Sequence, residues 1–329
     1  MKTTRTYLAS VILGFFLISN TSHAEVLYSV NGKIVNDVDL SSSMKLKFHE
    51  LQDELFHKKA SMVDNAILDQ YIEGQVKKTG KTRADIEKKL FDVKEPSDKE
   101  AKKWFEDNKQ RIPPQYKFEQ IKADIVRQIK TEKQKESYTV TLAKIKKDQK
   151  IKILIQAPVA PQISIKTDGF PVKGNKSAKV TIVEFADYQC PHCKEAGEVM
   201  KKVMKKYAKE AKLVFIDFPV NRSGISEVVA HGGVCADEQG KYWEYNELAF
   251  SKQTDLTKES PAELAKSLKL DVSKFTACLK SKKPEAKVKM AKDEAERVGV
   301  AGTPAIFVDG RKIHGYDEDE IVKAIESAL

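Results

Sequence analysis

Cysteine is scarce in this chain of 329 residues, which has four cysteines in all. Small secreted domains that depend on disulfides carry cysteine at much higher density, so a disulfide scaffold is excluded as the basis of the fold. Four cysteines still suffice for one reactive pair and one structural bridge. Long hydrophobic runs are also missing beyond the first 24 residues, where no segment offers the roughly 20 apolar residues of a membrane-spanning helix.

Charge is abundant, but neither sign forms a block. Charged residues make up 32% of the chain, and the formal net charge is +10. Lysine and glutamate are interspersed at helical spacing, which is typical of solvated helix faces rather than of a basic surface for nucleic acid. We therefore expect no nucleic-acid partner and at most a weak attraction to anionic membrane surfaces. Internal repeats and low-complexity tracts are absent from the sequence.

Residues 1–24 have the pattern of a cleaved signal peptide. Lys2 and Arg5 form a positive n-region, residues 7–18 form an apolar h-region, and residues 22–24 supply a small–x–small cleavage pattern. We therefore expect export to the periplasm. An uncleaved N-terminal anchor is the alternative, and a lipid anchor is disfavoured because no cysteine follows the cleavage site.

The remaining chain, about 300 residues long, is expected to form two domains. Residues 25–155 predict a mostly α-helical domain that opens with a small hairpin. Residues 156–162 contain two prolines and no hydrophobic period, which is typical of a linker. In residues 163–329 strands alternate with helices, so we expect an α/β domain with a helical insertion at about residues 226–287.

Local signals place several helices in the first domain. Apolar residues at helical spacing predict a first helix with a buried face, and a second helix is expected from Met62 to about Lys78. Thr82 and Ser97 begin capping-box patterns, so two shorter helices are expected to start there. The buried face of the first helix is predicted to consist of Met44, Phe48, Leu51 and Leu55.

A Cys-x-x-Cys motif, Cys190-Pro191-His192-Cys193, follows a β-branched strand at 180–185 and begins an amphipathic helix. The unpaired N–H groups and the dipole at a helix start stabilise the thiolate of the first cysteine, which is the attacking species in disulfide exchange. Pro191 suits the first helical turn because its missing N–H is no loss there. His192 can add positive charge or a hydrogen bond beside the sulfur. In this strand–helix context, the motif indicates thiol–disulfide exchange.

Three segments resemble the thioredoxin superfamily, and most closely its periplasmic DsbA-type branch. They are residues 184–193 around the motif, the aromatic block Gly-Lys-Tyr-Trp-Glu-Tyr at 240–245, and Gly-Val-Ala-Gly-Thr-Pro at 299–304. The resemblance covers about residues 161–329. It implies a thioredoxin fold with a helical insertion and the activity of a protein thiol–disulfide oxidoreductase.

The resemblance also implies roles for individual residues. Cys190 matches the nucleophile, and Cys193 matches the buried resolving thiol. Glu184 matches a buried acidic residue that helps to move a proton to or from the second cysteine, with a partly exposed strand residue as the alternative. Thr303 and Pro304 match the cis-proline loop that faces the disulfide and pairs with the backbone of a bound peptide, and Thr303 occupies a position that influences substrate release.

Cys235 and Cys278 lie in the predicted insertion. Two further cysteines in an oxidising compartment usually pair, so we expect a structural disulfide, with two buried thiols or a second redox pair as the alternatives. His231 lies four residues before Cys235, and with the motif it raises the question of a zinc site. A zinc site would consume the helix-start geometry that favours exchange, so we expect neither a metal nor another cofactor.

The helical domain resembles part of another family. Residues 30–40 are similar to the opening of SurA-type periplasmic chaperones, and residues 97–109 and 118–147 resemble the helices that flank their parvulin module. Only residues 110–115 stand in place of that module. The resemblance implies a chaperone-like cradle that holds unfolded polypeptide near the disulfide. A dimerisation arm that makes the chain a homo-oligomer, and a plain spacer, are the alternatives.

The expected function is disulfide exchange with unfolded or misoxidised secreted proteins, through a mixed disulfide on Cys190 that Cys193 resolves. The Pro-His dipeptide favours a disulfide donor recharged by a quinone-linked membrane partner. An oligomer-forming arm together with Thr303 favours an isomerase kept reduced by a membrane reductase, so the direction stays open. A holdase chaperone with a secondary thiol centre is the alternative from another class. A vestigial scaffold is disfavoured because both cysteines, Glu184 and Pro304 are present.

Overall fold

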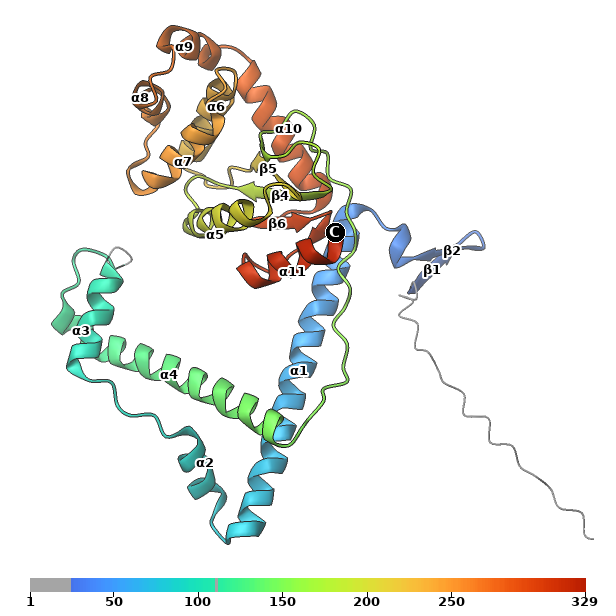
Figure 1. Cartoon of the computed structure of the whole chain (residues 1–329), viewed down its shortest axis with the longest axis vertical. Coiled ribbons are helices and arrows are strands. Elements are labelled where there is room, and N and C mark those ends of the chain that lie inside the picture. The colour runs from blue at the N-terminus through green and yellow to red at the C-terminus, as the bar shows by residue number, and fades with distance from the viewer. Residues whose placement is uncertain (1–24, 110–111) are drawn as a thin grey trace, which may run out of the picture. The chain divides into compact units, whose positions relative to one another are not determined.

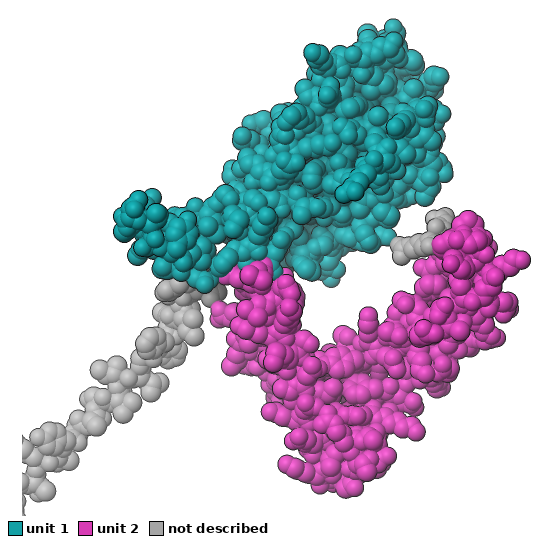
Figure 2. Space-filling model, turned by 180° about the vertical axis from the view of Figure 1, so that it is seen from behind, with its two compact units in different colours: residues 1–50, 159–329 teal, residues 51–158 magenta. Residues whose placement is uncertain are grey.

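The structure is a computed structural model that describes residues 25–109 and 112–329. The predicted signal peptide therefore lies outside the described residues. Figure 1 traces the chain, and Figure 2 shows its two compact units. Unit 1 comprises Met1–Glu50 and Val159–Leu329, and unit 2 comprises Leu51–Pro158. Within the described ranges, no helix combines the length and the apolar character needed to cross a membrane.

Unit 1 is built on a five-stranded sheet with the strand order β3-β5-β4-β6-β7. β4 and β5 run parallel, with Glu184 opposite Phe215, and β6 is antiparallel to β4, with Ile306 opposite Glu184. The three central strands are almost wholly buried, which explains their continuous apolar sequence. The strands are β3 (Val172–Gly174), β4 (Val180–Ala186), β5 (Ala211–Asp217), β6 (Ala305–Val308) and β7 (Arg311–Lys312).

Helices cover both faces of this sheet (Figure 1). α5 (Pro191–Tyr207) and α11 (Glu318–Ala328) pack on the face that carries Ile182 and Ile306. α10 (Lys283–Val298) packs on the opposite face, which carries Phe185. This α/β sandwich is the thioredoxin fold predicted from the sequence.

A helical insertion lies between β5 and α10. Its elements are α6 (Ile225–Asp237), α7 (Tyr242–Ser251), the 3-10 turn η3 (Gln253–Asp255), α8 (Ser260–Ser267) and α9 (Val272–Lys280). A disulfide joins Cys235 of α6 to Cys278 of α9, with an S–S distance of 2.01 Å. One apolar cluster contains residues of the insertion together with Tyr188 and Cys193. The insertion therefore packs against the buried side of the Cys-x-x-Cys motif.

Unit 1 also includes the start of α1 (Ser42–Thr79). Leu46 is completely buried in the apolar cluster on the α10 side of the sheet. Gly299 allows this close packing, because a Cβ there would lie 2.8 Å from the Cα of Ser43 and its φ is +86°. A two-stranded hairpin of β1 (Val26–Val30) and β2 (Lys33–Asn36) precedes α1, as expected.

Unit 2 consists of helices with little buried surface. α2 (Arg83–Phe91) and α3 (Asp98–Asp107) begin at Thr82 and Ser97, and both predicted capping boxes are confirmed. α4 (Phe118–Asp148) packs against α3 through a small cluster of buried residues. That cluster consists of Ala101, Phe105, Ile125 and Ile129.

Two expectations for α1 were wrong. The chain forms one helix of 38 residues where two were predicted, because the Lys-rich stretch between Leu55 and Met62 contains no residue that breaks a helix. The predicted buried face is also largely exposed, with Leu51 at 63% and Leu55 at 51% exposure, and Met44 is exposed as well. An apolar stripe shows which face of a helix is apolar, but it does not show that the chain itself covers that face.

Candidate active site

The Cys-x-x-Cys motif lies where β4 passes into α5. Cys190 is the N-cap residue of α5 and Pro191 occupies its first turn. The strand before the motif is buried, so the turn that carries Cys190 starts from a fixed position. Both cysteines are free thiols, and Cys190 is partly exposed whereas Cys193 is fully buried. The outer sulfur can therefore be reached by another protein, and the inner one cannot.

The two sulfurs contact different parts of the backbone. The Cys190 sulfur lies 3.3 Å from the carbonyl oxygen of Thr303, across 113 residues of sequence, and donates a hydrogen bond to it when the thiol is protonated. The backbone N–H of Asp187 donates to the Cys193 sulfur at 3.5 Å. The peptide bond between Thr303 and Pro304 is cis. The structure therefore brings the loop at Thr303 directly beside the outer sulfur.

Hydrogen bonds separate the acidities of the two thiols. The pKa of Cys190 is lowered to about 6, chiefly by a hydrogen bond from the Cys193 thiol. Hydrogen bonds from the Thr303 side chain and from the backbone N–H groups at the start of α5 lower it further. Burial opposes this shift. The same thiol–thiol hydrogen bond, together with burial, raises the pKa of Cys193 far above its usual range. At neutral pH, Cys190 is therefore mostly a thiolate and Cys193 keeps its proton.

Glu184 lies in the interior of unit 1, in the middle strand of the sheet. Its side chain is 1% exposed, so the alternative of a partly exposed strand residue does not hold. No hydrogen-bond partner for its Oε1 atom exists among the described residues. Burial raises the pKa of this carboxyl to about 8. The carboxyl is therefore mostly protonated at neutral pH. Because its pKa is close to neutral pH, a small rise in pH is enough for it to release the proton.

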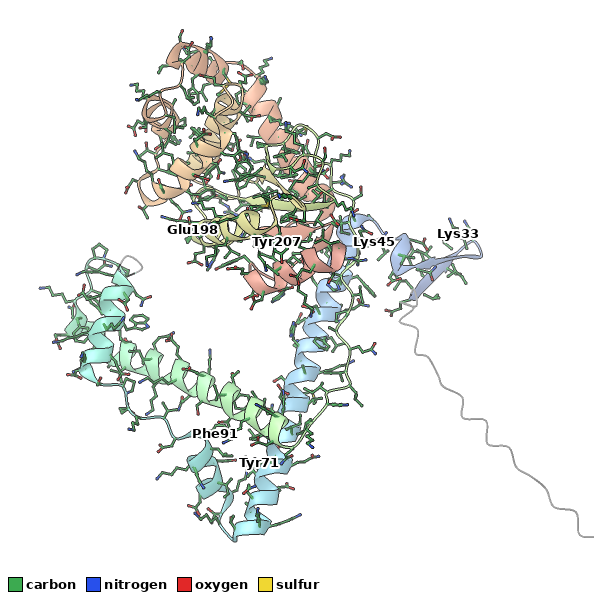
Figure 3. All side chains as sticks on the ribbon, viewed as in Figure 1. Lys33, Lys45, Tyr71, Phe91, Glu198 and Tyr207 are labelled. Carbon is green, nitrogen blue, oxygen red and sulfur yellow. A yellow bond between two sulfur atoms is a disulfide. The ribbon has the colours of Figure 1, made fainter. Side chains whose placement is uncertain are left out.

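A small pocket of unit 1 reaches Glu184. Its walls come from the sheet, from α5 and from α7, and they include the exposed residues Lys194 and Glu198 of α5 (Figure 3 labels Glu198). The apolar part of the wall includes Phe215, Trp243 and Phe250. The buried carboxyl thus lines a cavity that also has charged residues at the surface.

His192 points its Nδ1 atom at two other side chains. This atom lies 3.2 Å from Oε2 of Glu195 and 3.0 Å from the hydroxyl of Tyr316. The contribution of His192 to the lowered pKa of Cys190 comes from its backbone N–H. Tyr316 was not singled out in the sequence, because it approaches the motif from 124 residues away.

Gln253 and Asp187 hold the turn that carries the motif. The side-chain amide of Gln253 donates to the carbonyl oxygens of Tyr188 at 2.8 Å and Cys190 at 2.9 Å. The buried carboxylate of Asp187 accepts hydrogen bonds from the backbone N–H groups of Val220 at 2.7 Å and Asn221 at 3.0 Å. No local sequence signal identifies Gln253, since it belongs to the helical insertion.

The remaining candidates lie away from the reactive sulfurs. Cys235 and Cys278 are bonded to each other, so neither thiol is available as a metal ligand. His231 lies on α6, and burial lowers its pKa. In the described part of the chain, no group of three or more His, Cys, Asp or Glu side chains is placed to hold a metal ion.

Comparison with known proteins finds relatives of the half that carries this site. A family model described as Thioredoxin matches residues 166–327. Disulfide bond formation protein D of Bacillus subtilis (strain 168) is 31% identical over 182 residues, which cover 52% of this chain and 81% of that protein. The crystal structure of oxidised BdbD from Bacillus subtilis is 27% identical and covers 52% of this chain and 98% of that one, with a TM-score of 0.48.

Other relatives are longer proteins. The Na(+)/H(+) antiporter NhaA 3 of Salinispora tropica is 29% identical over 169 residues, which cover 51% of this chain and 26% of the antiporter. The chain thus spans about a quarter of the length of the antiporters that it matches. Residues 25–155 lie outside the family match, so their resemblance to SurA-type chaperones stays a prediction. The match to a disulfide bond formation protein over most of its length shows that this chain belongs to the thioredoxin-like family of DsbA-type thiol–disulfide oxidoreductases.

Proposed function

We propose that this protein forms disulfides in exported proteins, using the Cys190–Cys193 pair as the oxidant. The observation that carries this proposal is the difference between the two thiols at the start of α5. The outer thiol has a pKa lowered to about 6, and the inner thiol is buried with a raised pKa. A stabilised Cys190 thiolate favours the reduced form of the pair, and this makes the disulfide a stronger oxidant.

The reaction is an exchange in two steps. A substrate thiolate attacks the Cys190 sulfur of the oxidised pair, the Cys190–Cys193 bond breaks, and Cys193 leaves as a thiolate that takes up a proton. A second substrate thiolate then attacks the substrate sulfur of the mixed disulfide, and Cys190 leaves as a thiolate. Two electrons pass from the substrate dithiol to the cysteine pair, and the substrate gains one disulfide.

Glu184 is the proposed source of the proton for Cys193. It is buried and mostly protonated at neutral pH. Its pKa of about 8 lies close to neutral pH, so the carboxyl can both give up and regain a proton. The pocket that it lines is bordered by the exposed residues Lys194 and Glu198, which supports exchange of that proton with solvent.

The loop at Thr303 and Pro304 is the proposed docking site for the substrate backbone. Its support is the contact between the Thr303 carbonyl and the Cys190 sulfur, which places this loop beside the reacting atom. A peptide held there has its cysteine next to the outer thiol. The substrates proposed are unfolded or misoxidised secreted proteins, and the N-terminal pattern of residues 1–24 supports export to the periplasm.

The pair must be reoxidised after each turnover. A quinone-linked membrane oxidase is the proposed partner, because the lowered pKa of Cys190 favours a disulfide donor. The alternative is an isomerase that a membrane reductase keeps reduced. In that case Cys190 attacks a wrong disulfide in a misoxidised substrate, and no net oxidation takes place.

The helical domain of residues 25–155 is proposed to bind unfolded polypeptide or to associate with another copy of the chain. Its support is the apolar surface that the described residues leave uncovered on the hairpin and on α1. Large exposed side chains there are Val26, Tyr28, Val30, Ile34, Leu51, Leu55 and Met62. A holdase chaperone is the second candidate function, favoured by this surface alone.

One experiment separates these functions. The mature protein, Cys190→Ser and Cys193→Ser are each mixed with a reduced, unfolded protein that contains two cysteines. Wild type whose Cys190–Cys193 pair has been oxidised beforehand should form the substrate disulfide. Both variants should lose this activity, because neither can form the Cys190–Cys193 disulfide that takes up the two electrons. If suppression of substrate aggregation persists in both variants while wild-type oxidation is absent, the holdase reading replaces the proposed function.

A further inference from the structure

A cluster of three polar side chains lies beside the reactive centre. Glu195 is on α5, one turn after His192, and Tyr316 lies in the loop between β7 and α11. The Tyr316 hydroxyl donates a hydrogen bond to Oε2 of Glu195. The His192 Nδ1 atom lies 3.2 Å from that same oxygen and 3.0 Å from the Tyr316 hydroxyl. The three side chains therefore meet at His192, which lies within the Cys-x-x-Cys motif.

The proton positions in this cluster follow from its donors and acceptors. An ionised carboxylate only accepts hydrogen bonds, and a tyrosine hydroxyl has one proton to donate. Tyr316 gives that proton to Glu195. The two atoms that His192 Nδ1 contacts, Oε2 of Glu195 and the hydroxyl oxygen of Tyr316, can therefore only accept a hydrogen bond from it. The Nδ1 atom must therefore carry a proton, and the lone pair of the neutral ring is on Nε2.

Tyr316 is itself held in place. Its ring packs against the apolar cluster formed by α5, α11 and the sheet. Gly315 precedes it with a φ of +75°, and Asp317 follows it as the N-cap of α11, accepting a hydrogen bond from the backbone N–H of Glu320 at 3.0 Å. The hydroxyl therefore meets His192 from a rigid base, which makes it a suitable anchor for an exposed imidazole.

We propose that Tyr316 and Glu195 are positioning residues that hold the His192 imidazole by its Nδ1 atom and so limit the oxidising power of the pair. In the anchored position, the ring directs its protonated Nδ1 at Glu195, and the carboxylate offsets any charge on the imidazole. When the anchor is lost, the ring is free to turn toward the sulfur and stabilise the thiolate. The Cys190–Cys193 disulfide is then more easily reduced.

The test uses Tyr316→Phe, which removes the hydroxyl but keeps the packed ring and the net charge. We expect the equilibrium constant for reduction of the disulfide by glutathione to rise about threefold to tenfold, the range given by one hydrogen bond of ordinary strength. The pKa of Cys190, followed by the ultraviolet absorbance of its thiolate, should fall in parallel.

Tyr207→Phe is the matched control. Its hydroxyl donates to Oε1 of Glu326 at 2.6 Å and joins α5 to α11 without touching His192 (Figure 3 labels Tyr207). This variant should leave the equilibrium constant unchanged. A double-mutant cycle then assigns the effect to the imidazole, because Tyr316→Phe should have no effect in a His192→Ala background.

Three results would overturn this inference. They are an unchanged or lowered equilibrium constant in Tyr316→Phe, an equal change in Tyr207→Phe, or an undiminished effect of Tyr316→Phe in the His192→Ala background. The inference rests on the proposed thiol chemistry of Cys190. The two can fail separately, because a wild-type pair that exchanges with glutathione supports that chemistry whatever Tyr316→Phe does. A wild-type pair that does not exchange with glutathione would contradict both the proposed thiol chemistry and the inference about Tyr316.

Discussion

The two units of this protein are stabilised in different ways. In unit 1, helices cover both faces of a central sheet, and large side chains such as Phe185, Phe307 and Ile182 are fully buried. In unit 2, one small cluster of four buried residues joins α3 to α4. Ion pairs such as Lys133–Glu100 and Lys122–Asp98 lie at its surface, where each contributes little to the free energy of unfolding.

The difference fits the chemistry proposed for unit 1. The thiol chemistry needs Cys190, Thr303 and Gln253 held within hydrogen-bonding distance, although they come from three distant segments. A densely packed sheet can hold such positions, because close-packed interiors resist displacement. Unit 2 depends on helix caps and local contacts, so we expect it to unfold more easily than unit 1 and independently of the active site.

The largest expected effect comes from opening the core of unit 1. Phe185 is fully buried and its ring lies 5.9 Å from that of Phe307. Phe185→Ala should lower the free energy of unfolding by about 4 kcal/mol, because it leaves a cavity under the strand that ends at the motif. Urea unfolding, together with an exchange assay, should show that stability and activity fall together. A variant as active and as stable as wild type would contradict the assignment of this core to the site.

Removal of the structural disulfide should have the next largest effect. Cys235→Ala combined with Cys278→Ala removes a crosslink between residues 43 apart in sequence. The expected loss is about 3 kcal/mol, because the unfolded chain gains conformational freedom. Thermal unfolding measures it, and the redox equilibrium of Cys190–Cys193 in the folded variant should match that of wild type. A changed equilibrium would instead make the bridge part of the redox system.

The buried carboxyl of Glu184 should make stability depend on pH. Its pKa is about 8 in the folded protein and about 4.5 when exposed. Between pH 4.5 and pH 8 the folded state therefore holds a proton that the unfolded state has released. Stability should therefore fall as pH rises from 5 to 8, by about 3 kcal/mol from this group. Glu184→Gln should remove that part of the slope in urea unfolding of the disulfide form. Asp217, whose pKa burial raises to about 7, leaves a residual slope of the same sign. An unchanged slope would show that Glu184 is ionised in the folded state.

The smallest effect is expected in unit 2, and it should not reach the active site. Ser97→Ala removes the capping box of α3, in which the Ser97 hydroxyl accepts from the backbone N–H of Glu100. The expected loss in the free energy of unfolding is about 1 kcal/mol, confined to unit 2. Hydrogen exchange should show faster opening of α3, with no change in the protection of β4 and no change in disulfide exchange. A parallel loss in β4 would mean that the two units unfold together.

Local signals allowed much of this structure to be predicted. The capping boxes at Thr82 and Ser97 and the strand before Cys190 each depend on neighbouring residues, so a short stretch of sequence is sufficient to identify them. The roles given to Glu184, Thr303 and Pro304 needed the family resemblance, because burial and a cis peptide bond depend on distant parts of the fold.

Other features depend on contacts that sequence spacing does not encode. Gln253 and Tyr316 reach the motif only through the folding of the insertion and of the last loop. The exposure of Leu51 and Leu55 has a related cause, since an amphipathic pattern does not name the surface that covers it. The continuity of α1 depends on the absence of a breaking residue, which is a weak signal in a helix-rich sequence.

The most direct test of this account is the equilibrium of the Cys190–Cys193 pair with glutathione in the protein without residues 1–24. The lowered pKa of Cys190 predicts a reduction potential well above that of the glutathione couple, and a reduced form that is more stable than the oxidised form. A potential near or below that of glutathione would contradict the role of disulfide donor and would favour an isomerase or a reductase.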